Sequence, residues 1–194
     1  WDVFNSGTPA ARNAPVAPGG AVIPSSLGAG SNGLLALIRS GEGSWNSVNR
    51  GTAGDSGPIP NLTSMTIGSV EQMQQRNKVF AVGAYQFTPG VLSLARREAG
   101  LSPSDQMSPE NQNKMAMALI VGSKRPALAA YVTGKSNDLN AAHYDIAREW
   151  AALQAPSGRG MYDNDKAGNM ASIPAAKVQA MLIQARQEYL SRGR

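Results

Sequence analysis

Carboxylates are the side chains on which catalysis by this chain would have to rest. The sequence has 13 Asp and Glu residues, no cysteine and a single histidine, His143. A cysteine peptidase is therefore excluded, and a zinc hydrolase would lack its usual imidazole and thiolate ligands. A Ser-His-Asp triad would have to use His143, yet a lone histidine in a helical segment is more typical of packing or of a surface.

Glu42 is the carboxylate whose position is most unusual. It lies one turn after Ile38 and two turns after Leu35. If the predicted helix of residues 32–41 continues to Glu42, all three side chains project from one apolar face. Burial raises the pKa of a carboxyl group, which then stays protonated near neutral pH and can donate a proton to a leaving oxygen. The alternative is that the helix ends at Ser40 and that Glu42 is a solvated loop residue.

The composition indicates one globular domain with an attached segment of different character. Of the 194 residues, 42% are hydrophobic and 16% are charged, and no apolar run reaches the ~18 residues that a membrane span needs. Residues 1–30 are rich in Pro, Gly, Ala and Ser, which predicts a linker or arm, so that residues 31–194 form the domain. The start at Trp1 has neither Met nor a basic segment, and we expect a processed piece of a longer secreted or delivered protein.

The charge of the chain points to an anionic partner. The formal net charge is +5, but the basic residues are dispersed along the sequence without a dense run. Aromatic residues make up only 6% of the chain and do not alternate with the basic ones, as they would in a stacking surface for nucleic acid. We therefore expect no specific nucleic-acid binding, and the bacterial envelope is another candidate for the anionic partner.

Helical patterns dominate the domain. The sequence predicts an α+β fold, mainly α, with a small irregular or β lobe after the first helix. Within that lobe we expect a short hairpin around residues 62–67, and Ser69 begins a pattern typical of a capping box. The expected helices, several of them started by a cap or by proline, cover residues 32–41, 69–76, 89–99, 109–121, 126–132, 137–154 and 174–190.

Several segments occur in an order that resembles a known family. Leu34–Gly43, with its Ser-Gly-Glu-Gly end, is followed by Val48–Asp55, by Leu62-Thr63 and by Val82–Phe87, which contains Gly-Ala-Tyr-Gln-Phe. This series resembles lysozyme-like phage endolysins of the lambda type and related bacterial muramidase and lytic transglycosylase domains. Ser108–Gln112 and Ile146–Leu153 resemble later segments of the same family, so that the resemblance covers about residues 31–190.

The resemblance implies roles for three residues. In that family the glutamate at the end of the first long helix is the catalytic acid, which corresponds to Glu42. The Tyr-Gln pair that lines the sugar-binding cleft corresponds to Tyr85 and Gln86. An amide such as that of Gln86 can donate to and accept from sugar hydroxyl and acetamido groups. For Tyr85 the alternative is a core aromatic residue whose hydroxyl is satisfied.

Four further residues are candidates for the site. Asp55, thirteen residues after Glu42, is the candidate second carboxylate, although Gly54–Gly57 also fits an ordinary turn in which Asp bonds its own backbone. Trp45 is placed to stack on a sugar ring. Asn49, within the second motif, and Tyr162, in the loop of residues 156–172, are the remaining candidates for substrate binding.

The predicted function is therefore cleavage of the β-1,4 bond between N-acetylmuramic acid and N-acetylglucosamine in peptidoglycan, in the periplasm or cell wall. Hydrolysis by a lysozyme and non-hydrolytic cleavage by a lytic transglycosylase both remain open, as do a chitinase-like activity and a non-catalytic glycan-binding module. We expect a monomer without a cofactor. We also expect no bound metal, because the EF-hand-like start at Asp163 would place Ala167 and Pro174 at positions that need oxygen ligands. The parent protein would be a phage endolysin or an antibacterial effector, and a toxin would have an immunity protein as partner.

Overall fold

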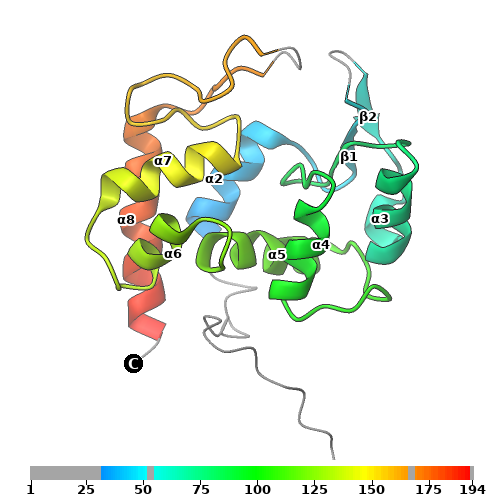
Figure 1. The fold of residues 1–194 in the computed structure, drawn as a ribbon, viewed down its shortest axis with the longest axis horizontal. Helices are drawn as coiled ribbons and strands as arrows, with labels where there is room; N and C mark the ends of the chain where they lie inside the picture. Colours follow the sequence, from blue (N-terminus) through cyan, green and yellow to red (C-terminus); the bar gives the residue numbers. More distant parts are fainter. Residues whose placement is uncertain (1–31, 52–54, 166–168, 193–194) are drawn as a thin grey trace, which may run out of the picture.

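A computed structural model of the chain describes residues 32–51, 55–165 and 169–192, and the predicted linker of residues 1–30 lies outside these ranges. Within them the chain forms seven α-helices and a small three-stranded antiparallel sheet (Figure 1). The prediction of an α+β fold that is mainly α is therefore confirmed.

Helix α5 (Pro109–Val121) is the centre of the helical body. Ser108 caps it by accepting a hydrogen bond from the backbone N–H of Asn111 at 3.2 Å, and Pro109 occupies the first turn. All residues from Met115 to Val121 are buried, which is typical of a helix surrounded by other elements. Its neighbours are α2 (Asn32–Glu42), α4 (Val91–Glu98) and α6 (Pro126–Val132). The predicted bounds of α5 and α6 are confirmed.

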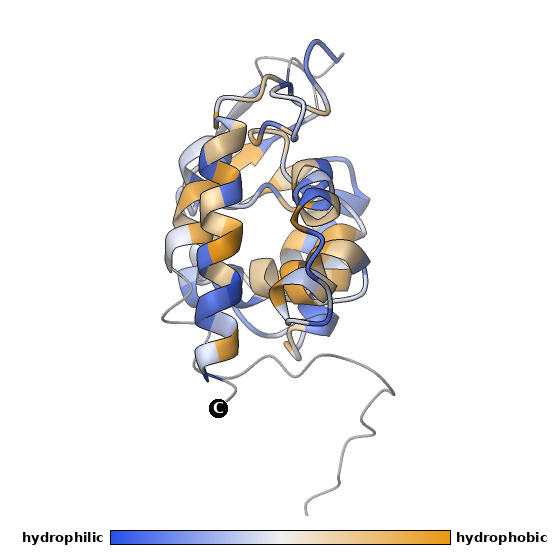
Figure 2. Cartoon of the chain, turned by 90° about the vertical axis from the view of Figure 1, so that its left-hand side faces the viewer, coloured by the Kyte–Doolittle hydropathy of each residue, from blue (hydrophilic) through white to orange (hydrophobic). Residues whose placement is uncertain are grey.

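Two more helices complete this body. Helix α7 (Leu139–Glu149) packs on α6, and α8 (Ala175–Arg192) packs on α2, α6 and α7. Figure 2 shows polar and apolar residues alternating along α8, which covers one side of the molecule. The prediction that α7 continues to residue 154 is wrong: the backbone of Trp150 is extended, with φ −124° and ψ 116°, and the chain turns into the core there.

The small lobe follows α2, as the sequence predicted, but its elements differ from the expected ones. Strand β1 (Ser47–Asn49) pairs with β2 (Ser56–Pro58) and with β3 (Ala81–Val82), so that Val48 lies opposite both Gly57 and Val82. The hairpin is therefore at residues 47–58, and the predicted hairpin at residues 62–67 is wrong. Residues 62–64 form a 3-10 turn.

Two helix starts also differ from prediction. Helix α3 (Ile67–Gln75) is capped by Thr66, whose side chain accepts from the Ser69 N–H at 3.2 Å, so the capping residue is not Ser69. Helix α4 starts at Val91 because Gly90, with φ 77°, is not helical.

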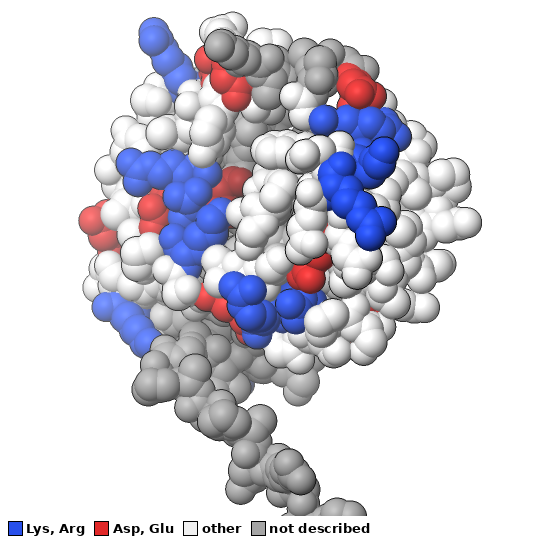
Figure 3. All heavy atoms as spheres, turned by 45° about the vertical axis from the view of Figure 1, so that its right-hand side comes forward, with Lys and Arg blue, Asp and Glu red and all other residues white. Residues whose placement is uncertain are grey.

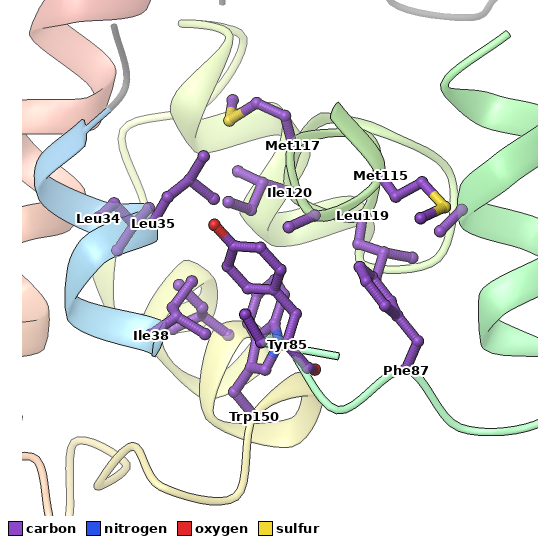
Figure 4. Packing of buried hydrophobic residues seen from close by; sticks show 14 of the residues in the cluster. Leu34, Leu35, Ile38, Tyr85, Phe87, Met115, Met117, Leu119, Ile120 and Trp150 are labelled. Carbon is purple, nitrogen blue, oxygen red and sulfur yellow. The ribbon is translucent and has the colours of Figure 1, made fainter. Parts of the chain in front are cut away.

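One core joins the two parts of the molecule. Figure 4 shows Leu34, Leu35 and Ile38 of α2 facing the side chains of α5, with the rings of Tyr85 and Trp150 packed between them. Because Tyr85 follows β3 and Trp150 follows α7, this packing fixes the small lobe and the end of α7 against α2.

Candidate active site

Glu42 is the last residue of α2, and its side chain is largely buried. The helix continues past Ser40, so Glu42 lies on the same face as Leu35 and Ile38, both of which are buried. The Oε1 atom of Glu42 accepts a hydrogen bond from the backbone N–H of Ala152 at 2.9 Å. The interpretation of Glu42 as a solvated loop residue is therefore excluded.

Burial changes the acidity of this carboxyl group. Desolvation raises the pKa of Glu42 from 4.5 to about 6, and the hydrogen bond from Ala152 partly opposes that shift because it stabilises the charged form. A substantial fraction of Glu42 is thus protonated in mildly acidic solution, unlike an exposed glutamate.

The absence of a side chain at Gly41 allows the contact between Glu42 and Ala152. A Cβ atom at position 41 would lie 2.5 Å from the Cβ of Ala152 and 2.9 Å from Cδ1 of Ile173. Any residue other than glycine would therefore push the segment that carries the Ala152 N–H away from the end of α2.

The turn between β3 and α4 brings Gln86 to the same place. Gln86 has a φ of 48°, which is unusual for a residue with a side chain, and its Nε2 donates to the carbonyl of Gly83 at 2.8 Å. A Cβ at Gly43 would lie 3.6 Å from Nε2 of Gln86. The Gln86 amide therefore lies beside the residue that follows Glu42.

The buried side chain of Gln112 in α5 holds this turn. It accepts from the N–H of Ala84 at 2.8 Å and donates to the carbonyls of Trp45 and Met107 at 3.0 and 2.7 Å. A single amide thus ties the loop after α2 to the turn that carries Gln86. This role could not be predicted, because the helix pattern does not distinguish Gln112 from any other polar residue.

Tyr85 is mainly a residue of the hydrophobic core. Its side chain is 2% exposed, its hydroxyl donates to Oδ1 of Asn113, and Nη1 of Arg39 donates to that hydroxyl at 3.4 Å. Its backbone carbonyl accepts from Nε1 of Trp150 at 3.2 Å. The structure thus matches the alternative that the sequence left open, a core aromatic residue with a satisfied hydroxyl.

A cleft of about 450 Å³ opens at Glu42. It runs between the small lobe and the loop after α7, which lie at the same end of the molecule in Figure 1. Of the predicted site residues, it brings together Glu42, Asn49, Tyr85, Gln86 and Tyr162. Residues that the sequence did not single out also line it: Gly51, Phe80, Ala81, Phe87, Thr88, Val91, Leu119, Lys124, Arg125, Arg148, Glu149, Ala151, Asp165 and Asn169.

Phe80 is the aromatic residue that sequence reasoning missed. It precedes β3 in a segment that we expected to be irregular, yet its side chain lines the cleft and is 48% exposed. An exposed aromatic ring in a cleft offers an apolar face on which a sugar ring can stack. The exposure of the Phe80 side chain depends on the folded structure and could not be predicted from the sequence.

Two predicted residues lie outside the cleft lining. Asp55 is exposed and pairs with Arg50, with 3.5 Å between Oδ1 and Nη1. Trp45 packs against the core: its ring meets that of Tyr85 edge-on at 6.3 Å, and the guanidinium of Arg39 lies 4.7 Å from its ring centre. The predicted roles, Asp55 as the second catalytic carboxylate and Trp45 in stacking on a sugar ring, therefore have no support in the placement of their side chains.

No metal-binding group and no membrane-spanning helix is found in the part of the chain that the structure describes. Across residues 32–51, 55–165 and 169–192, no three His, Asp or Glu side chains gather as metal ligands would. Within the same ranges no helix has both the length and the apolar character to cross a bilayer.

His143 is buried, with Nε2 at 2.8 Å from the carbonyl of Gln154, and does not line the cleft.

Comparison of the chain with protein-family models, with curated proteins and with solved structures finds no match. The chemistry of the cleft is therefore the basis on which a function can be inferred.

Proposed function

We propose that this chain cleaves the glycan strands of bacterial peptidoglycan at the β-1,4 bond between N-acetylmuramic acid and N-acetylglucosamine. The main support is the placement of Glu42: a largely buried carboxyl group with a pKa of about 6 that lines a cleft of about 450 Å³. A volume of this size suits a small polar ligand or part of a polymer. Glu42 is the general acid of the proposed reaction.

The hydrogen bond from Ala152 determines which oxygen of Glu42 would carry the proton in the proposed reaction. An N–H group donates to an unprotonated oxygen, so Oε1 accepts from Ala152 and the proton of the neutral acid resides on Oε2. Oε2 then donates this proton to the glycosidic oxygen, which leaves with the neighbouring sugar, while positive charge develops on the ring that loses this oxygen. The carboxylate that remains keeps the Ala152 N–H as a partner, which stabilises its negative charge.

Other residues of the cleft suit a sugar polymer. The amides of Gln86 and Asn49 can exchange hydrogen bonds with hydroxyl and acetamido groups, and the ring of Phe80 can stack on a sugar face. Tyr162 donates its hydroxyl hydrogen to the carbonyl of Arg148 at 2.7 Å, which ties the loop after α7 to the cleft wall.

Non-hydrolytic cleavage is the second candidate, and the position of Asp55 favours it. Glycosidases with two carboxylates hold them roughly 5–10 Å apart across the scissile bond. Asp55 does not line the cleft, and Glu149, which does, is engaged by Lys124 and Arg125. A transglycosylase needs one acid–base group only, because the 6-hydroxyl of the substrate attacks and yields a 1,6-anhydro sugar.

Mass spectrometry of the soluble products from purified peptidoglycan tests both candidates. Wild-type protein should release muropeptides, and Glu42→Gln should release at least a hundredfold less, since loss of a general acid costs 10²–10⁴ in rate. Glu188→Gln is the matched control, because Glu188 lies on α8, outside the cleft lining, in a hydrogen bond with Gln184 at the surface. Reducing ends would identify a hydrolase and 1,6-anhydro ends a transglycosylase.

If wild-type protein binds peptidoglycan but releases nothing from any wall preparation, the enzyme proposal is wrong and the chain is a glycan-binding module. If it releases N-acetylglucosamine oligomers from chitin as readily as muropeptides from peptidoglycan, the substrate is wrong. The proposal places the chain in the cell wall or periplasm, as part of a phage endolysin or a delivered toxin with an immunity protein.

A further inference from the structure

A cluster of basic side chains lies along the helical wall of the cleft, and the proposed reaction does not use it. Lys124 and Arg125 come from the turn between α5 and α6, and Arg148 comes from the last turn of α7. Figure 3 shows a hollow on this side of the molecule with Lys and Arg side chains gathered beside it and an acidic group recessed within it. We call Lys124, Arg125 and Arg148 the basic cluster.

The basic cluster is organised around one buried carboxylate. The side chain of Glu149 is 4% exposed, and its oxygens accept from Nζ of Lys124 at 2.6 and 2.7 Å and from Nε of Arg125 at 2.7 Å. Arg125 also donates through Nη2 to the carbonyl of Arg148 at 2.6 Å. These bonds hold the side chains of Lys124 and Arg125 in fixed positions instead of leaving them to move in solvent.

The turn that presents Lys124 and Arg125 is itself tightly built. The N–H of Ser123 donates to Oε1 of Glu98 in α4 at 3.1 Å, and the hydroxyl of Ser123 donates to the same oxygen. A Cβ at Gly122 would lie 2.1 Å from Oε2 of Glu98, so only glycine permits this approach. The fold therefore positions two adjacent cations at the cleft.

The positive charge of the cluster exceeds what its own carboxylates neutralise. Glu149 is shared by two cations. Arg148 pairs with Asp145 at 3.5 Å and lies 5.9 Å from the ring centre of Tyr144, and the other oxygen of Asp145 caps the start of α6. Asp165, the other acid at this end of the cleft, accepts from the backbone and side chain of Asn169. The Arg148 side chain is 49% exposed and lines the cleft, so its guanidinium can accept a ligand.

We propose that the basic cluster binds a carboxylate of the peptide stem that substitutes N-acetylmuramic acid, so that the chain selects peptide-bearing strands over bare glycan. A guanidinium recognises a carboxylate through two parallel hydrogen bonds, and this pairing is stronger inside a cleft than on an open surface. The inference rests on the proposed function, because it assumes that the glycan strand occupies the cleft at Glu42.

Arg148→Gln is the most direct variant. The backbone carbonyl of Arg148, which accepts from Arg125 and from Tyr162, is unchanged by the substitution, so the cluster and the loop after α7 keep their anchors. Arg97→Gln is the matched control: Arg97 is exposed on α4, lies outside the cleft lining and carries the same charge. It accounts for the general loss of attraction to an anionic wall.

The experiment measures kcat/KM of each variant on intact peptidoglycan and on glycan strands from which an amidase has removed the stems. Arg148→Gln should lower kcat/KM on intact peptidoglycan at least tenfold, mainly through KM, in line with the loss of a charge-assisted hydrogen bond. On stem-free strands it should stay within about twofold of wild type, since only the bond to the stem is lost. Arg97→Gln should affect both substrates equally and weakly.

An equal loss by Arg148→Gln on both substrates, or no loss on either, would overturn the inference. Binding of a soluble muropeptide, measured by calorimetry, separates it from the proposed function. If wild-type protein cleaves neither substrate but binds the muropeptide at least tenfold more tightly than Arg148→Gln does, the stem site stands and the enzymatic proposal fails. If wild-type protein neither cleaves nor binds, both are wrong.

Discussion

Replacing Glu42 by glutamine should stabilise the protein while it abolishes cleavage. Glutamine is nearly the same size as glutamate, and its Oε1 can still accept from the N–H of Ala152. What the substitution removes is the cost of burying a negative charge at the end of α2. The gain in stability must therefore depend on pH, because the negative charge of Glu42 is present only after its carboxyl group has lost its proton.

The magnitude follows from the shift in acidity. Burial raises the pKa of Glu42 from 4.5 to about 6 in the folded protein, and each unit of pKa corresponds to about 1.4 kcal/mol. Below pH 4.5 the carboxyl group is protonated in both folded and unfolded chains, so it carries no penalty. As the pH rises from 4.5 to 6, the unfolded chain releases its proton first, and the wild type loses about 2 kcal/mol relative to Glu42→Gln. Above pH 6 the difference stays constant.

Chemical denaturation at pH 4 and at pH 8, followed by tryptophan fluorescence, measures this difference directly. We expect similar free energies of unfolding for wild type and Glu42→Gln at pH 4, and a variant that is more stable by about 2 kcal/mol at pH 8. Glu188→Gln should not show this gain, since the Glu188 carboxylate lies at the surface, where it accepts from Gln184. A difference that is the same at both pH values, or a variant less stable than wild type at pH 8, would refute the burial of the Glu42 charge.

Four further predictions concern the same site. kcat/KM for peptidoglycan should fall about tenfold per pH unit above pH 6, because only protonated Glu42 can donate, and a pH–rate profile measures this limb. Gly41→Ala should destabilise the fold by about 1–3 kcal/mol and lower kcat, because its Cβ would lie 2.5 Å from that of Ala152. Thermal unfolding measures the loss of stability and a turnover assay measures kcat. Wild-type values of both would contradict the close approach of Gly41 to Ala152. Gln112→Leu should cost about 3 kcal/mol or more by leaving the Ala84 N–H and the Trp45 and Met107 carbonyls without partners, and urea unfolding measures it. Asp55→Asn should keep activity within about twofold of wild type, since Asp55 lies outside the cleft lining, and a large loss would restore its catalytic role.

Local signals in the sequence predicted the helices well where they determine structure on their own. Ser108-Pro109 and Pro126 begin α5 and α6 at the expected residues because a cap and a proline in the first turn act through the nearest backbone groups. The spacing of Leu35, Ile38 and Glu42 left two interpretations of Glu42 open, a carboxyl group on the buried face of the helix or a solvated loop residue, and the structure shows the first.

The small lobe could not be predicted because its strands are too short to carry a pattern. β1 and β2 have three residues each, and β2 reads Ser-Gly-Pro, which indicates a turn and not a strand. Val48 is the buried residue of β1, and its partners Gly57 and Val82 come from distant positions. The hairpin therefore depends on packing against the helical body, which no local signal reports.

The walls of the cleft also depend on long-range packing. Lys124 and Arg125 are adjacent, whereas Arg148 lies more than twenty residues further along the chain, and all three looked like dispersed surface charges. In the structure the side chains of Lys124 and Arg125 meet at Glu149, and Arg125 also donates to the carbonyl of Arg148. Phe80 and Gln112 were missed for the same reason: Phe80 belongs to no motif, and the segment Ser108–Gln112 indicated no role for Gln112. Asn49, Gln86 and Tyr162 were predicted members of the cleft, whereas its basic wall was not predicted.

The contact between Glu42 and Ala152 joins residues 110 positions apart in the chain. During synthesis the N-terminal half emerges first, and α2 then has neither Ala152 nor Ile173 beside its last turn. Without this cover the acidity of Glu42 is closer to that of an ordinary glutamate. Under the function that we propose, a nascent or truncated chain would hold every residue of α2 and yet lack its general acid, so activity would begin only when the last third of the domain has folded.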